Sequence, residues 1–327
     1  MNEKLTAERH SKLVADLLSL VGALTVVASA SIVGHTSQGS MGMSLVLLVT
    51  YGNSVMRFAE TLCLYDSDLE AVGRLRKFIE RTPIEERIPD IKLPSKWPGR
   101  GDIELIDVTA RYRGSPNSAP ALDDISMKVD PGQKVGITGP GRSGKSSLFL
   151  TILGFLDYTG TIIIDGVDIS TVPHHELRTR ITTVTNHDIK LGGSVRDSLL
   201  PFAGQQDDVT INDWLLYEAL DQVGLWEIVE AAGGYGAPVS KLSLNRQQRH
   251  LLCIARAMMQ RLHTQSRLVL MDEPTTQLDS ETAALAQDVM EEAFLESTVL
   301  TAAESENSLP VVDMLLGLED GGIEFVD

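Results

Sequence analysis

The sequence predicts an α/β domain with a largely parallel sheet, preceded by a helical hairpin. Three observations support this prediction. From Gly101 onward, short apolar runs typical of strands alternate with longer runs typical of helices. A glycine-rich stretch, GPGRSGKSS, lies between one such strand and one such helix. Upstream, residues 13–33 and 41–56 form two apolar runs separated by a short polar break.

Composition excludes several classes of protein. The 327 residues carry 45 Asp and Glu against 28 Lys and Arg, a formal net charge of −17. This balance argues against a nucleic-acid partner, whose phosphates require clustered basic side chains. The two cysteines, Cys63 and Cys253, predict neither a disulfide framework nor a zinc site. No secretory signal peptide is expected after Met1.

The apolar hairpin has the features of two membrane spans, at about residues 13–33 and 40–58. The first run carries one charge, Asp16, and has the length of a membrane-crossing helix. The break at 34–39 lacks Lys and Arg, whereas both outer flanks contain them, which predicts that both ends lie in the cytoplasm. The alternative is a buried hairpin in a soluble protein.

The remaining elements follow in order. Residues 60–81 show helical spacing and complete a first domain at 1–81. Residues 82–100, rich in proline and charge, form a linker to a second domain at 101–327. Strands are expected at 102–112, 134–140, 160–169, 181–185, 267–274 and 298–303, helices at 146–156, 249–259 and 283–294, and a strand pair with an Asp-Gly turn at 314–327.

The glycine-rich stretch satisfies the pattern G-x-x-x-x-G-K-[ST] and predicts a phosphate site. Its backbone N–H groups and the following helix N-terminus would point at the phosphate. Lys145 would reach the β- and γ-phosphates, and the Ser146 hydroxyl would bind Mg²⁺. The alternative is a simple glycine turn. The expected contacts of this loop are Gly139, Pro140, Gly141, Arg142, Ser143, Gly144, Lys145, Ser146 and Ser147.

Two carboxylates end the apolar run RLVLMDE. A buried strand that ends in an acid places that acid at the carboxyl edge of the sheet, where ligands of open α/β sheets bind. Asp272 would hold Mg²⁺ through water, and Glu273 would accept a proton from an attacking water. The alternative is a strand that simply meets solvent.

These residues resemble the C-terminal part of an ATP-binding-cassette (ABC) exporter, and most closely the second half of a multidrug-resistance-associated (C subfamily) transporter of fungal type. The resemblance covers essentially the whole chain and is carried by WPGRGDIELIDVTARYR, GTIIIDGVDIS, QRHLLCIARAMM and LVLMDEPTTQLD, together with the glycine-rich loop. It implies that ATP and Mg²⁺ bind and that Tyr112 stacks on adenine. It also implies that the hairpin is the last pair of membrane helices and that residues 203–261 form a helical subdomain.

Several positions depart from the family pattern. The Q-loop glutamine falls on Asn186, the switch histidine on Glu304, and a loop glycine on Arg142. A glutamate with an ordinary pKa is an anion at neutral pH and would repel a γ-phosphate. The signature, normally Leu-Ser-x-Gly-Gln, reads Leu242, Ser243, Leu244, Asn245 and Arg246. These changes predict ATP binding with weak or absent hydrolysis, while family drift with retained activity is the alternative.

The function implied is the ATP-binding part of a membrane exporter, with its nucleotide-binding domain in the cytoplasm. Its partners would be membrane lipid, a second nucleotide-binding domain and the membrane helices absent here, since a homodimer would supply only four spans. The chain would therefore be truncated or work beside another chain. The alternatives are an ATP-binding regulatory subunit that transports nothing, and a soluble P-loop ATPase.

Overall fold

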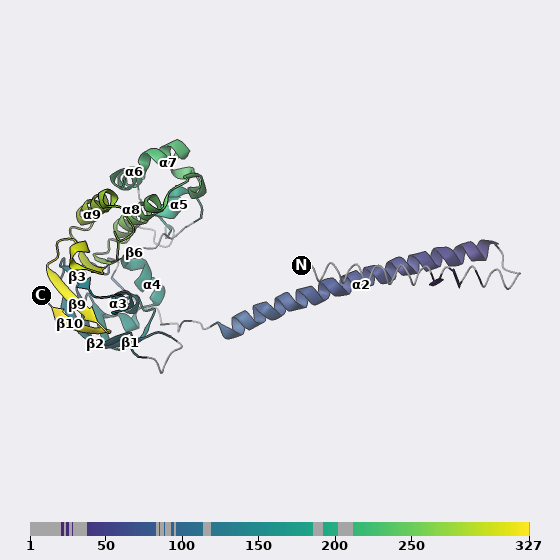
Figure 1. The fold of residues 1–327 in the computed structure, drawn as a ribbon, viewed down its shortest axis with the longest axis horizontal. Helices are drawn as coiled ribbons and strands as arrows, with labels where there is room; N and C mark the ends of the chain where they lie inside the picture. Colours follow the sequence, from purple (N-terminus) through teal and green to yellow (C-terminus); the bar gives the residue numbers. More distant parts are fainter. Residues whose placement is uncertain are drawn as a thin grey trace. The chain divides into compact units, whose positions relative to one another are not determined.

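The computed structural model describes residues 38–82, 96–113, 119–185, 192–201 and 212–326, with a few single residues before residue 97. The chain divides into two units, Met1–Glu86 and Arg87–Asp327. In the first unit, helix α2 spans Gln38–Arg81 (Figure 1). In the second unit, strands and helices alternate along part of the chain as the sequence predicts, but runs of consecutive strands and of consecutive helices also occur.

Helix α2 is continuous, so the predicted second span and the predicted helix at 60–81 are one element. Its second half carries exposed ion pairs at helical spacing, Glu70–Arg74 at 3.4 Å and Arg76–Glu80 at 2.7 Å. Such pairs each contribute about 0.3–0.5 kcal/mol. Among the residues that are described, no helix is both long enough and apolar enough to cross a membrane. The predicted span at 13–33 lies largely outside the described residues.

The second unit contains ten strands in its described residues, in two sheets. The strands are β1 (Ile103–Arg111), β2 (Leu122–Val129), β3 (Lys134–Thr138), β4 (Asp157–Ile164), β5 (Val167–Asp168), β6 (Thr182–Thr185), β7 (Leu268–Asp272), β8 (Thr298–Ala303), β9 (Met314–Glu319) and β10 (Gly322–Val326). The helices are α3 (Lys145–Ile152), α4 (His174–Arg180), α5 (Val195–Leu199), α6 (Asp213–Gln222), α7 (Trp226–Ala232), α8 (Arg246–Thr264) and α9 (Ser280–Ala293), with short 3₁₀ turns η1 (Ile169–Thr171), η2 (Gly234–Gly236), η3 (Val239–Lys241) and η4 (Glu306–Ser308).

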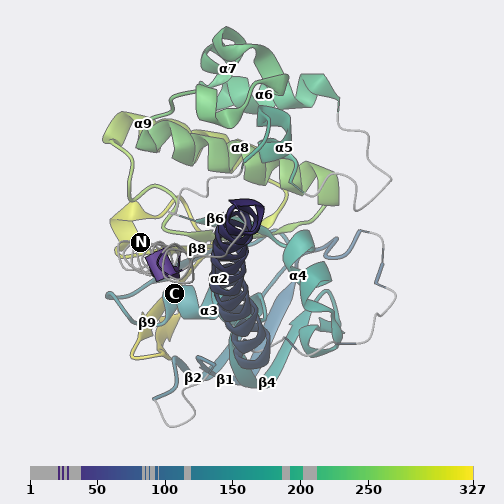
Figure 2. The ribbon, with the colours of Figure 1, turned by 90° about the vertical axis from the view of Figure 1, so that its right-hand side faces the viewer.

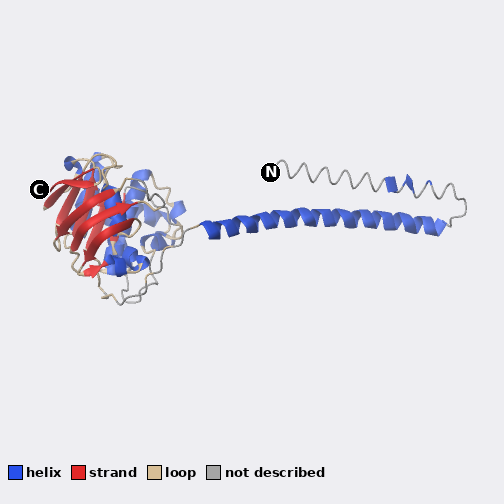
Figure 3. Cartoon of the chain, turned by 90° about the horizontal axis from the view of Figure 1, so that it is seen from below, coloured by secondary structure: helices blue, strands red, loops and turns tan. Residues whose placement is uncertain are grey.

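The two sheets differ in type. The six-stranded sheet has the order β10-β9-β3-β8-β7-β6 and is parallel except for β10. The four-stranded sheet, β2-β1-β4-β5, is antiparallel. The expectation of one largely parallel sheet is therefore incomplete, because the strands predicted at 102–112 and 160–169 pair with each other in the second sheet. The strand pair with an Asp-Gly turn is confirmed, as β9 and β10 are antiparallel neighbours. Figure 3 shows the strands of the second unit in red, with the C-terminus of the chain beside them.

The six-stranded sheet buries both of its faces, and β7 shows how. Successive side chains of a strand point to opposite faces. Leu268 and Leu270 enter a first core, together with the antiparallel sheet and α3. Val269 and Met271 enter a second core, together with the helices α5 to α9. Burial on both faces explains why the sequence of this strand is continuously apolar rather than alternating.

The helices α5 to α8 gather at one end of the unit, away from β1, β2 and β4 (Figures 1 and 2). The described part of the predicted helical subdomain, from residue 212 to 261, contains α6, α7, η2, η3 and most of α8. Helix α8 is the longest of these elements, with 19 residues. One face of α8 packs against α5 and α6 in the second core.

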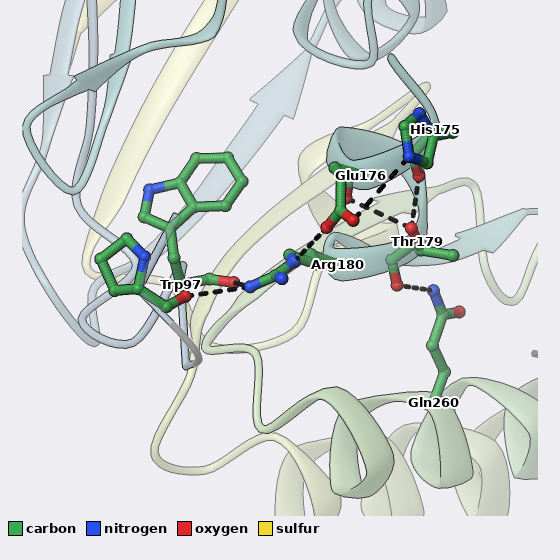
Figure 4. Close-up of polar contacts among 7 residues, drawn as sticks. Trp97, His175, Glu176, Thr179, Arg180 and Gln260 are labelled. Atoms are coloured by element: carbon green, nitrogen blue, oxygen red, sulfur yellow. Dashed lines mark hydrogen bonds and ion pairs between the residues drawn. The ribbon is translucent and has the colours of Figure 1, made fainter. Parts of the chain in front are cut away.

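The segment that enters the second unit is fixed to it, although the sequence predicts a linker there. Trp97 is 2% exposed, and its Nε1 donates to the carbonyl oxygen of Ile164 at 3.0 Å. Arg180, at the end of α4, donates to the carbonyl oxygens of Pro94 at 3.0 Å and Trp97 at 3.4 Å (Figure 4). Glu176 holds the Arg180 guanidinium at 2.8 Å. Burial of the indole and these bonds therefore make Pro94 and Trp97 part of the second unit.

Candidate functional site

The glycine-rich loop connects the end of β3 to the start of α3, as predicted. Two of its glycines have backbone conformations that L-residues rarely adopt, with φ of 154° at Gly139 and 110° at Gly144. A Cβ at Gly139 would lie 2.1 Å from the Leu318 carbonyl oxygen and 2.6 Å from Ser143 Oγ. Both positions therefore require glycine for backbone conformation, and Gly139 also for space.

The first turn of α3 presents donors that the chain itself does not use. The backbone N–H groups of Lys145, Ser146 and Ser147 have no acceptor within the described part of the chain. Such unpaired N–H groups at a helix N-terminus attract anions. The Lys145 side chain is 6% exposed, and its Nζ donates to the carbonyl oxygens of Gly139 at 2.7 Å and Pro140 at 3.1 Å. The ammonium group thus lies against the loop, where a phosphate would meet it.

The loop is supported from outside by the turn between β9 and β10. The Gly321 N–H donates to the Ser143 carbonyl oxygen at 3.0 Å, and the Gly321 carbonyl accepts from the Asp123 N–H at 2.8 Å. The Ser143 hydroxyl oxygen is buried and has no hydrogen-bond partner among the described residues. The sequence predicts this turn but not its contact with the loop, because a hydrogen bond across 178 residues leaves no local pattern.

Arg142 is exposed, and its φ is 71°. This is the left-handed region, which costs an L-residue about 1–2 kcal/mol. The structure thus gives a physical reason for the glycine that the family pattern has at this position.

Three carboxylates lie at the edge of the sheet that carries the loop. Asp272 ends β7 opposite Ala302 of β8, and the Glu273 N–H donates to the Ala302 carbonyl at 3.0 Å. Glu304 follows β8 directly, and Ala303 is the register partner of Thr138, the residue before the loop. Because these strands are parallel neighbours, the sheet brings their carboxyl ends together. Glu304 is exposed, whereas Asp272 and Glu273 are half-buried.

Tyr112, which directly follows β1, is also close to the loop. Its hydroxyl and the Ser147 hydroxyl share a hydrogen bond of 3.0 Å. Its side chain remains 51% exposed. An aromatic ring beside the first turn of α3 could pack against a planar ligand group while the loop holds the phosphates.

The predicted signature residues lie at the start of α8. Asn245 is the N-cap of this helix, because its side chain accepts from the Gln248 N–H at 2.8 Å while Gln248 Oε1 accepts from the Asn245 N–H at 3.0 Å. Ser243 has a φ of 46°. This capping box stabilises α8 by about 1 kcal/mol. Asn245 and Gln248 have the spacing of a capping box in the sequence, but this role was not predicted from it.

The first turns of α8 are bonded to the segment that follows Glu273. Gln247 Nε2 donates to the Asp279 carboxylate at 2.5 Å, and the His250 ring bonds the Pro274 carbonyl oxygen. Asp279 caps α9. The hydrogen bond that its carboxylate accepts from the Thr282 N–H has the largest effect on the pKa of this carboxyl group and lowers it. The signature segment and the carboxylates are thus connected through short polar contacts. The predicted Q-loop position, Asn186, lies outside the described residues.

The fold and this arrangement define a P-loop nucleotide-binding domain of the α/β class. Residues 122–276 match the family model described as "ABC transporter". This segment is therefore an ATP-binding domain of the ABC transporter type, a type that binds ATP and Mg²⁺.

Curated proteins similar to the chain carry the same family name. The chain is 29% identical over 94% of its length to "ABC multidrug transporter B" of Aspergillus fumigatus, covering 20% of that protein. It is 32% identical over 97% of its length to "ABC transporter gloK" of Glarea lozoyensis, covering 23%. It is 30% identical over 93% of its length to "ATP-binding cassette sub-family C member 8" of Cricetus cricetus, covering 19%. The chain thus spans about a fifth of the length of these relatives.

Proposed function

We propose that the chain is the ATP-binding part of an ABC-type exporter and couples ATP binding to movement of a substrate out of the cytoplasm. One observation carries this proposal: the loop, with Lys145 and the unpaired N–H groups of α3, lies at the same sheet edge as Asp272 and Glu273. The whole chain is similar to fungal ABC transporters.

In this proposal each residue of the site has a separate task. The loop N–H groups and Lys145 bind the phosphates, and Tyr112 packs against the adenine. The Ser146 hydroxyl, and Asp272 through water, would hold Mg²⁺, which supplies charge neutralisation at the β- and γ-phosphates when bound. Glu273 orients a water and accepts its proton. The residues fit these groups, because the Lys145 ammonium and the unpaired N–H groups of α3 match the negative phosphates, while the Ser146 hydroxyl and the Asp272 carboxylate are oxygen ligands of the kind that Mg²⁺ prefers.

We further propose that hydrolysis at this site is impaired. Glu304 adds a third carboxylate to an edge that must accept a polyanion, and like charges in such a site repel. Asn245 places a side chain, already used as a helix cap, where the family pattern has glycine. Removal of the Glu304 charge should therefore restore turnover more readily than a change within the glycine-rich loop.

The membrane part remains a proposal of its own. Residues 13–33 and 40–58 would be the last two membrane helices of a bundle, followed by the linker and the cytoplasmic domain at 101–327, although the described residues of α2 by themselves fall short of the apolar character of a span. Because the chain spans about a fifth of its relatives, the other helices and a second nucleotide-binding domain would come from another chain or from a longer form. Extraction of membranes with alkaline carbonate tests this part, since release into the supernatant would contradict it.

A second candidate is an ATP-binding regulatory subunit that transports nothing. The presence of Glu304 and Asn245 at two turnover positions favours it, because both leave the binding residues intact. Under this proposal the chain would bind ATP without hydrolysing it, and the bound ATP would make the chain close on a partner domain.

Calorimetry and phosphate release with the purified full chain test both candidates. Mg-ATP should bind, and Lys145→Ala should abolish binding, while Lys128→Ala, at an exposed lysine of β2, serves as a matched control. Hydrolysis that disappears in Glu273→Gln would reject the regulatory subunit. If the wild-type chain binds Mg-ATP without hydrolysing it, and Glu304→His gains turnover, the proposal of impaired hydrolysis would be supported. Failure of the wild-type chain to bind Mg-ATP would reject both candidates.

A further inference from the structure

Four aromatic side chains at the helical end of the unit form a continuous cluster, of which the first is exposed and the other three are half-buried, here called the aromatic ladder: Trp214, Tyr217, Trp226 and Tyr235. Neighbouring ring centroids are 5.4, 5.0 and 5.3 Å apart along this order. The rings come from α6, α7 and η2, far from the antiparallel sheet (Figures 1 and 2). The nucleotide site uses none of them.

Packing does not account for the whole ladder. Trp226 and Tyr235 pack partly against the second core. Trp214, however, remains 63% exposed and is absent from that core. Large aromatic side chains are enriched where proteins bind partners, because they bury much area with little loss of conformational freedom. An indole held against Tyr217 but open to solvent is therefore available to a ligand.

The charge around the ladder is mostly negative, with Arg196 of α5 as the basic side chain beside it. Residues 212–236 contain five carboxylates and no Lys, Arg or His. Asp213 forms an ion pair with Arg196. The other four, Glu218, Asp221, Glu227 and Glu230, are exposed and form no ion pair within the described part of the chain.

The acids and rings share helix faces. Residues three and four apart on a helix are neighbours, so Trp214, Tyr217, Glu218 and Asp221 form one stripe on α6. The opposite face, with Leu216, Ala219 and Leu220, is buried. On α7 the same spacing places Glu230 beside Trp226. Aromatic faces flanked by unpaired carboxylates attract cations both by the ring quadrupole and by net charge.

We propose that the aromatic ladder and its four carboxylates bind a basic peptide segment of a partner protein, one that presents several Arg or Lys side chains. A single ammonium or guanidinium group interacts within about 6 Å of one ring centroid. The ladder extends over three such separations, and the carboxylates lie on two helices. A chain with repeated cations matches this length, whereas one small cation does not. This proposal is independent of nucleotide binding.

The test uses the full chain and a synthetic probe. The probe is a twelve-residue peptide of alternating Arg and Ala with blocked ends, and an alternating Glu and Ala peptide is its control. Isothermal titration and Trp fluorescence measure binding. Trp214→Ala should weaken the affinity for the basic peptide about 2- to 30-fold, which corresponds to the strength of one cation–π contact from exposed to desolvated sites. Trp214→Phe should restore part of the affinity.

Two matched controls separate this site from general attraction to an acidic protein. The variant with Glu218→Gln, Asp221→Asn, Glu227→Gln and Glu230→Gln should weaken binding more than the variant with Glu281→Gln, Asp288→Asn, Glu291→Gln and Glu292→Gln on α9. Leu295→Ala, at an exposed apolar residue elsewhere, should change nothing. Equal loss in both neutralised variants, an unchanged affinity in Trp214→Ala, or full displacement of the peptide by tetramethylammonium would overturn the proposal.

Discussion

Replacement of Arg142 by glycine should stabilise the nucleotide-binding domain. Arg142 has a φ of 71°, a conformation that costs an L-residue about 1–2 kcal/mol. Glycine removes this cost but adds about 0.5–1 kcal/mol of backbone entropy to the unfolded chain. The side chain is exposed and forms no ion pair among the described residues, so little else changes. The net gain expected is therefore about 0.5–1 kcal/mol.

Urea unfolding of the full chain without nucleotide measures this gain. Arg142→Ala is the matched control, because it removes the guanidinium but keeps the Cβ that causes the strain. The alanine variant should unfold at the wild-type midpoint or below it, and the glycine variant above it. A glycine variant less stable than the alanine variant would refute the argument from backbone conformation. Mg-ATP titrations of both variants then show whether the guanidinium itself contributes to binding, since both lack it equally.

Three further predictions concern residues that support the site. Trp97→Ala should destabilise the domain by about 3–5 kcal/mol, because it leaves a cavity and removes the donor to the Ile164 carbonyl, whereas Trp97→Phe should cost less. A urea midpoint that hardly moves in the alanine variant would show that the entry segment is not anchored. Lys134→Met should cost about 1–3 kcal/mol, since it removes the donor to the carbonyl oxygens of Phe294, Leu295 and Ser297, and Lys134→Arg should recover part of this in the same assay. The Thr282 N–H lowers the folded-state pKa of Asp279, so this carboxylate stabilises the fold fully above its unfolded pKa of 3.8 and loses that contribution as the pH falls further. Asp279→Asn should therefore lose less stability than the wild type between pH 6 and pH 3, and parallel curves for the two proteins would contradict this sign.

The sequence predicted the elements that depend on local pattern. The loop at Gly139–Ser147, the strand that ends at Asp272, and the turn at Asp320 and Gly321 each follow from residues next to one another. Their placement at one sheet edge follows from the parallel arrangement, because parallel strands end on the same side.

Other features depend on partners far away in the chain and could not be read locally. An apolar run does not state which strand it will pair with, so the separate antiparallel sheet was not foreseen. The burial of Trp97 against Ile164 depends on a contact across 67 residues, and a segment rich in proline and charge gave no sign of it. The capping box at Asn245 and Gln248 is a local signal in the spacing of these two residues, but the signature pattern, which has glycine at position 245, does not indicate it.

The support of the loop by the turn at Gly321 has a consequence for biosynthesis. The strands β9 and β10 leave the ribosome after every residue that would touch the nucleotide. Until they dock, the Ser143 carbonyl lacks its donor and Gly139 lacks the Leu318 backbone that shapes it. A nascent chain stalled before residue 314 should therefore contain the complete loop and still fail to retain ATP, so that competence to bind arises late in translation rather than when the loop itself emerges.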